Sequence, residues 1–224
     1  MFVLLKSLLY FLGILPYRIR VKIVRFLTKK LIDYYADLKI TGLENIPEET
    51  VIFVCNHLSN ADGIIFRDIL AHRHVVFMAG VKLQGEYLTN LVLETIDHIS
   101  IHPNQPDRKA LKEAIEASRG GKDIFIFPEG TRSRTGKMIE GRSGVLLIAK
   151  QAGVPLVPVG IWGSEKLLPI QSGKMDQEWF QKAQVNVVFG QPFTLTELDE
   201  EKAIESLMKR IARLLPEDYR GIYL

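Results

Sequence analysis

A histidine and an aspartate five positions apart, His57 and Asp62, could carry out acid–base chemistry. They follow the apolar run Val51–Cys55, which is typical of a buried strand. A neutral imidazole, with an ordinary pKa of about 6.5, can take a proton from a hydroxyl near neutral pH. A carboxylate on the other ring nitrogen fixes the tautomer and stabilises the imidazolium that forms. The pair has no nucleophile beside it, so the hydroxyl to be activated would belong to the substrate.

The same segment has two other interpretations. Ser59 and Asp62 match the spacing of a helix capping box, in which the aspartate only closes the first helical turn. Cys55 could form a nucleophilic pair with His57. Because Cys55 ends an apolar run, we predict a buried and inert thiol instead. It is the single cysteine of the chain, so no intrachain disulfide can form.

A second segment, FPEGTRSRTGK over residues 127–137, follows the apolar run Asp123–Phe127. Its proline and glycines favour an irregular backbone whose amides can turn toward a ligand. Arginine suits bidentate phosphate recognition, and the segment and its continuation supply Arg132, Arg134, Lys137 and Arg142. We predict an anion site here, most simply for a phosphate. The alternative is a solvated basic loop in which Glu129 pairs with an arginine.

Together the two segments resemble the pattern of the glycerolipid acyltransferases, whose best-known members are the 1-acyl-sn-glycerol-3-phosphate acyltransferases. NHLSNAD over residues 56–62 carries the H-x4-D motif, and FPEGTRS begins 70 residues after His57. VPLVPV over residues 154–159 matches a third family block. The resemblance covers about residues 40–195.

One block departs from that pattern. Between the two hallmarks the family usually has Gly-x-Ile-aromatic-Ile-x-Arg, whereas residues 97–103 read DHISIHP. Asp97 and Pro103 therefore stand at the glycine and arginine positions. Arg108 and Lys82 are candidates to replace the missing arginine. The departure bears on the identity of the acceptor more than on the type of reaction.

The resemblance implies transfer of a fatty acyl group from a thioester, acyl-CoA or acyl-acyl carrier protein, to a lysophosphatidic acid, giving phosphatidic acid. It implies His57 as general base, Asp62 as the residue that orients it, and Arg132 as the principal phosphate ligand. Glu129, Gly130 and Thr131 would hold the acceptor with Arg132. The resemblance implies no cofactor and no metal, and a backbone amide or Lys82 as oxyanion donor.

Three alternatives stay open. The acceptor could be another lysophospholipid or glycerol 3-phosphate. The protein could be a lipid thioesterase or hydrolase, with water in place of the acceptor. It could also be a non-enzymatic membrane module that binds phospholipid. The other histidines have no acidic or cysteine companion at ligand spacing, so we predict no metal site; they are His72, His74, His98 and His102.

Alternating short apolar runs and helical segments predict the elements that position these residues: an α/β domain with a mixed, largely parallel sheet flanked by helices. Ligands of such sheets bind beyond the carboxyl ends of the strands. The predicted strands are Val51–Cys55, Val75–Ala79, His98–Ile101, Asp123–Phe127, Pro155–Ile161 and Val185–Phe189. The predicted helices lie near 62–71, 87–93, 107–119, 141–152 and 199–214.

The charge is unevenly placed. Residues 1–40 carry eight basic and two acidic side chains, a net of +6, whereas the chain as a whole has +3. We therefore divide the chain into an N-terminal two-helix arm, residues 1–40, and an α/β acyltransferase domain, residues 41–224. With 47% hydrophobic residues the chain is not disordered.

The arm has the pattern of a membrane-surface element. Residues 1–15 are mostly apolar, and after Pro16 a basic row borders an apolar stripe that contains Ile19, Phe26 and Leu31. The longest charge-free stretch of the arm, residues 7–17, is shorter than the ~20 residues that a membrane-spanning helix needs. We predict peripheral or monotopic association with anionic phospholipid at the cytoplasmic face of the cell membrane, and no nucleic-acid binding. The alternative is that both helices simply pack on the domain.

Overall fold

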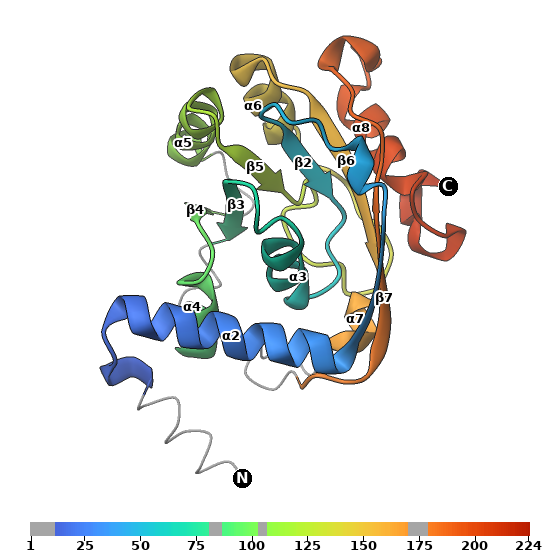
Figure 1. The fold of residues 1–224 in the computed structure, drawn as a ribbon. Helices are drawn as coiled ribbons and strands as arrows, with labels where there is room; N and C mark the ends of the chain where they lie inside the picture. Colours follow the sequence, from blue (N-terminus) through green and yellow to red (C-terminus); the bar gives the residue numbers. More distant parts are fainter. Residues whose placement is uncertain (1–11, 81–86, 103–106, 170–178) are drawn as a thin grey trace.

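A seven-stranded mixed sheet forms the centre of the protein, in the order β1-β7-β6-β2-β5-β3-β4 (Figure 1). The structure is a computed structural model that describes residues 12–80, 87–102, 107–169 and 179–224. All neighbouring strands are parallel except β6 and β7. This confirms the predicted α/β class. The strands are β1 (Ala36–Thr41), β2 (Ile52–Cys55), β3 (Val75–Gly80), β4 (His98–Ile101), β5 (Asp123–Ile126), β6 (Leu156–Trp162) and β7 (Ala183–Phe189).

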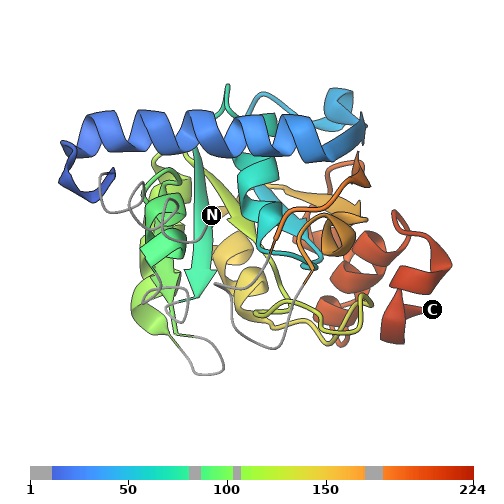
Figure 2. The same ribbon diagram turned by 90° about the horizontal axis from the view of Figure 1, so that it is seen from below.

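Helices cover both faces of the sheet, which explains why its central strands are apolar throughout (Figures 1 and 2). Every residue of β2 and β5 is buried. On one face lie α2 (Tyr17–Tyr35), α3 (Ala61–Ile69), α4 (Tyr87–Leu93) and α7 (Ser164–Leu167). On the other lie α5 (Arg108–Arg119), α6 (Gly144–Ala152) and α8 (Ala203–Ala212).

The side chains of β2 alternate between two hydrophobic cores. Ile52 and Val54 join the core under α5, α6 and α8. Phe53 and Cys55 join the core under α3, where the ring of Phe125 lies 4.5 Å from that of Phe66. Truncating a buried phenylalanine to alanine costs about 3–5 kcal/mol, so this core holds β2 and β5 firmly under the loops that follow them.

Two elements were not predicted, β1 and α7. β1 follows α2 without a turn residue between Tyr35 and Ala36, and its residues alternate between half-buried and exposed. It pairs with β7 as an edge strand, so residues 36–40, which we assigned to the arm, take part in the sheet. α7 has only four residues, too few for a helical period. The first predicted helix lies largely outside the described residues.

Helix α2 confirms the helix predicted after Pro16. Its inner face buries Val24, Thr28 and Ile32, which recur every fourth residue. The predicted apolar stripe is largely uncovered, since Ile19 is 49% and Phe26 is 60% exposed. Among the described residues, no helix is both long and apolar enough to cross a membrane.

Candidate active site

The two segments singled out in the sequence meet at one edge of the sheet. β2 and β5 are parallel neighbours, so the loops that follow them leave from the same edge. Two hydrogen bonds join the loops at His57: its backbone N–H donates to Glu129 Oε1 at 3.0 Å, and its carbonyl accepts from Ser133 N at 2.8 Å. The backbone of His57 is thus held from both sides by the 127–133 loop.

His57 and Asp62 form a close pair. His57 Nδ1 lies 2.8 Å from Asp62 Oδ2, and the side chain of Asp62 is fully buried while that of His57 is 18% exposed. A carboxylate can only accept at this contact, so Nδ1 carries the proton and Nε2 has the lone pair. The ring is therefore in the tautomer that a general base requires.

Backbone amides hold the carboxylate of Asp62 in place. Oδ2 also accepts from the N–H groups of Leu58 and Ser59, both at 2.9 Å. The N-cap of α3 is Asn60 and has no side-chain cap hydrogen bond, so the capping box considered at Ser59 is not formed, whereas the carboxylate of Asp62 contacts His57 directly. Asp62 Oδ1 is buried and has no hydrogen-bond partner among the described residues.

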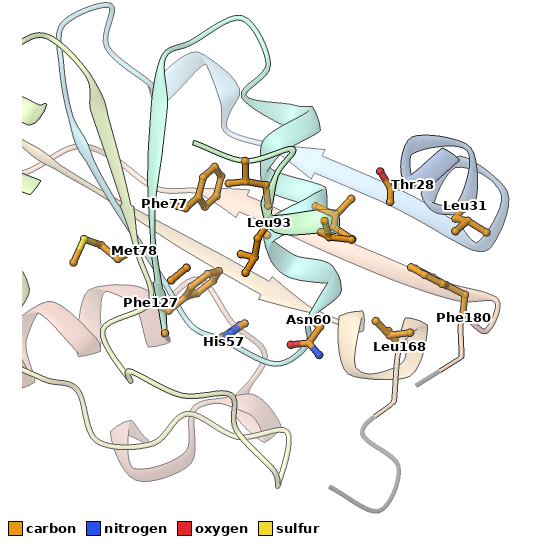
Figure 3. Close-up of a pocket in the computed structure, with 16 residues that line it drawn as sticks. Thr28, Leu31, His57, Asn60, Phe77, Met78, Leu93, Phe127, Leu168 and Phe180 are labelled. Carbon is orange, nitrogen blue, oxygen red and sulfur yellow. The ribbon is translucent and has the colours of Figure 1, made fainter. Parts of the chain in front are cut away.

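The ring of His57 stacks on that of Phe127, with centroids 4.0 Å apart and planes inclined by 17°. Both rings line an apolar cavity of about 300 Å³, which we call the first cavity (Figure 3). It extends between α2, α3 and β3 toward Leu31 and Phe180. The histidine thus lies at one end of an apolar space.

Asn56 fastens the start of this loop to β6. Its side chain donates to the carbonyl of Ile161 at 2.8 Å and accepts from the same residue's N–H at 2.9 Å. The backbone hydrogen bonds between β2 and β6 end at Cys55, and the side chain of Asn56 makes the next two in place of its backbone. Asn56 is fully buried, so His57 emerges from a rigid base.

Glu129, expected among the acceptor-binding residues, is buried with both oxygens engaged. Oε1 accepts from His57 N, and Oε2 accepts from Ile139 N at 3.0 Å. Burial raises the pKa of Glu129 to about 7. The two backbone hydrogen bonds oppose this rise, whereas the charge of Asp62 adds to it. This geometry makes Glu129 a positioning residue for the histidine loop.

The other expected acceptor-binding residues lie at the surface of the same loop. Gly130 adopts φ +68° and lines a second cavity, of about 490 Å³, whose lining also includes Phe127. Thr131 is exposed and Arg132 is partly exposed. The side chain of Arg142 passes close to Gly130: a Cβ added to this glycine would lie 3.7 Å from Arg142 Cγ. The backbone N–H of Arg142 donates to the carbonyl of Pro128 at 2.7 Å. The loop therefore brings cationic side chains to the edge where His57 lies.

Three further residues were considered from the sequence: the thiol of Cys55 as a nucleophile, and Arg108 and Lys82 as replacements for the missing arginine. Cys55 is fully buried, and burial raises the pKa of its thiol well above the ordinary value, as expected of an inert residue. Arg108 is exposed on the first turn of α5. Lys82 lies outside the described residues.

Sequence reasoning missed the roles of Asn56 and Phe127. Both belong to the motif runs, but neither carries a charge or a titratable group. Only their contacts across the sheet edge show what they do: Asn56 bonds to β6, and Phe127 stacks on His57.

Three comparisons with known proteins bear on the family of this chain. Residues 37–162 match the family model described as Acyltransferase. A probable 1-acyl-sn-glycerol-3-phosphate acyltransferase of Mycoplasma pneumoniae is 29% identical over 78% of this chain and 69% of its own length. A chloroplastic 1-acyl-sn-glycerol-3-phosphate acyltransferase of Brassica napus is 29% identical over 59% of this chain, and the match spans 39% of its length.

The crystal structure of the 1-acyl-sn-glycerophosphate acyltransferase from Thermotoga maritima has a similar fold. It superposes with a TM-score of 0.68 and 26% identity, covering 94% of this chain and 86% of that one. The family match covers more than half of the chain and includes both the H-x4-D and the FPEGTRS runs. The chain therefore belongs to the acyltransferase family.

Proposed function

We propose that this protein transfers a fatty acyl group from a thioester to the free hydroxyl of a lysophosphatidic acid, producing phosphatidic acid. The observation that carries the proposal is the His57–Asp62 pair at the end of an apolar cavity, beside a cationic loop. The names of the relatives support the same acceptor, since each is a 1-acyl-sn-glycerol-3-phosphate or 1-acyl-sn-glycerophosphate acyltransferase.

In this reaction Nε2 of His57 removes the proton of the acceptor hydroxyl as its oxygen attacks the thioester carbon. The carbonyl oxygen becomes an oxyanion, and the imidazolium is stabilised by Asp62. The oxyanion then re-forms the carbonyl and expels the thiolate, which takes the proton from Nε2. The product is an ester and a free thiol, and no acyl-enzyme forms.

The first cavity suits the acyl chain of the donor. Its lining is mostly apolar and includes His57, near which the thioester carbon has to lie (Figure 3). Each methylene that leaves water contributes about 0.8 kcal/mol, so a long chain would be held mainly by this cavity.

The decisive experiment incubates the purified protein with acyl-CoA or acyl-acyl carrier protein and a panel of lysolipids, with and without phosphate. Acceptor-dependent release of thiol, abolished in His57→Ala, is the expected result. Thioester cleavage that added acceptor does not increase would identify a thioesterase instead. Absence of transfer to every phosphate-bearing acceptor would refute the proposal.

A substitution at Gly63 tests the cavity assignment. Gly63 lines the first cavity, and a Cβ there would meet only Ile96 Cδ1, at the ordinary distance of 3.7 Å. Gly63→Leu should lower the ratio of long-chain to short-chain donor turnover about tenfold, because the new side chain displaces roughly two methylenes. Gly63→Ala is the matched control and should keep most of the preference. An unchanged ratio in Gly63→Leu would place the acyl chain elsewhere.

We also propose that the N-terminal arm holds the protein at a membrane surface. The exposed side of α2 presents apolar residues such as Ile19 and Phe26 among its basic residues. Each basic residue near an anionic surface contributes about 1 kcal/mol. Removing residues 1–33, which leaves β1 in place, should release the protein from vesicles that contain phosphatidylglycerol. Undiminished binding would contradict this role.

A further inference from the structure

The chain contains a second histidine–aspartate pair with the spacing of the first. His102 and Asp107 are five positions apart, and His102 Nδ1 lies 2.8 Å from Asp107 Oδ2. Asp107 is thus an acidic partner of His102 that the spacing expected of metal ligands did not predict. His102 follows β4 directly, as His57 follows β2 closely.

The aspartate of this pair is held as firmly as Asp62. Oδ1 accepts from the N–H of Ala110 at 3.0 Å and caps α5, while Oδ2 accepts from the N–H of His102 at 3.0 Å. These backbone hydrogen bonds, from Ala110 first and then from His102, lower the pKa of Asp107 to about 2. Asp107 is therefore ionised at neutral pH and Nδ1 of His102 carries a proton. This leaves Nε2 as the ring nitrogen that can meet a ligand.

The surroundings of His102 differ from those of His57. Its side chain is 60% exposed, and it lines the second cavity together with Gly130 and Arg142. The inner part of this cavity is apolar, with Ile126 and Ile148 among its lining. The two cavities share Phe127, whose ring stacks on His57. The mouth thus combines an imidazole with a guanidinium next to the catalytic edge.

We propose that His102, held by Asp107, and Arg142 bind the phosphate of the acceptor lipid at the mouth of the second cavity, in addition to Arg132, which the family resemblance implies as a phosphate ligand. The inference rests on the proposed function, and it names the residues that recognise the acceptor. Arginine binds phosphate in a bidentate manner. Nε2 of His102 adds one hydrogen bond in either protonation state. A protonated Nε2 donates to a phosphate dianion, and an unprotonated Nε2 accepts from a phosphate hydroxyl.

The location agrees with the reaction. The two cavities share Met78, Gly80 and Phe127 in their linings, so a donor chain in the first and an acceptor in the second would meet near the ring that stacks on His57. The second cavity also lies beside the block, residues 97–103, in which this chain departs from the family pattern. His102 directly precedes the position at which the family has an arginine. In this proposal it therefore contacts the phosphate with an imidazole.

Binding of a short-chain lysophosphatidate, measured by titration calorimetry, tests the inference without requiring turnover. His102→Ala should weaken binding about tenfold, the value of one charge-assisted hydrogen bond, and Arg142→Gln should do so by at least as much. His102→Arg should restore most of the affinity. The matched monoacylglycerol, which lacks the phosphate, should bind equally to the wild type and to His102→Ala.

His98→Ala is the matched control, since His98 begins β4, the strand that His102 follows, but bonds to the carbonyl of Ile96 and is not part of the second cavity. In transfer assays His102→Ala should raise the acceptor KM and leave the donor KM and kcat unchanged.

Unchanged lysophosphatidate binding in His102→Ala would overturn the inference, as would an equal loss of the phosphate-free ligand. Specific binding without acyl transfer would instead refute the proposed function and leave the phosphate site standing.

Discussion

The two histidine–aspartate pairs share spacing and geometry but not environment. In both, Nδ1 and Oδ2 are 2.8 Å apart, and the carboxylate also accepts backbone N–H groups. The histidine side chain is 18% exposed in the first pair and 60% in the second. Electrostatic interactions are stronger where water is excluded, which suits the less exposed pair to the proposed proton transfer. The ring of the second pair is reached by solvent and ligands, which suits it to the proposed binding role.

The largest contrast is expected when each histidine is removed. His57→Ala should lower kcat by on the order of 10³, since general base catalysis contributes about 10²–10⁴-fold. His102→Ala should keep kcat at saturating acceptor. Initial rates over a matrix of donor and acceptor concentrations measure both effects. A comparable fall in kcat in the two variants would contradict the assignment of proton transfer to His57 and binding to His102.

Replacing each aspartate by asparagine sharpens the contrast. Asp62→Asn can still accept through its amide oxygen but loses the charge that stabilises the imidazolium, so kcat should fall by on the order of 10². Asp107→Asn should raise the acceptor KM only about threefold, because asparagine still caps a helix well and its amide oxygen can still accept from His102. Thermal unfolding of the two variants serves as the control. A larger kinetic effect of Asp107→Asn than of Asp62→Asn would reverse the assignment.

The smallest effect concerns Glu129, which supports the first pair. Its pKa is raised from 4.5 to about 7, so between these values the folded protein binds more protons than the unfolded chain. Stability therefore falls as the pH rises through this window, by at most about 3 kcal/mol from this group. Glu129→Gln cannot titrate there.

Urea unfolding of wild type and Glu129→Gln from pH 4.5 to 7.5 measures this difference. The free energy of unfolding of the wild type, relative to the variant, should decrease with rising pH. A constant or increasing difference would show that the carboxylate stays ionised throughout the window.

Much of the site was accessible from sequence because its chemistry lies in short runs. His57 and Asp62 are separated by one loop and the start of one helix, so local geometry brings them together. The central strands were recognised because burial on both faces leaves them apolar throughout. β1 escaped prediction because an edge strand with one exposed side is polar at every second residue.

The sequence by itself determined the family, the α/β class and the first acid–base pair, since each is written in a contiguous pattern of residue types. The tertiary structure decided the rest. It bonded Glu129 to the histidine loop, stacked Phe127 on His57, and formed two cavities that both include this phenylalanine in their linings. It also revealed the second pair. The physical reason is that burial, and with it the strength of every polar interaction at the site, depends on how strands and helices distant in sequence pack together.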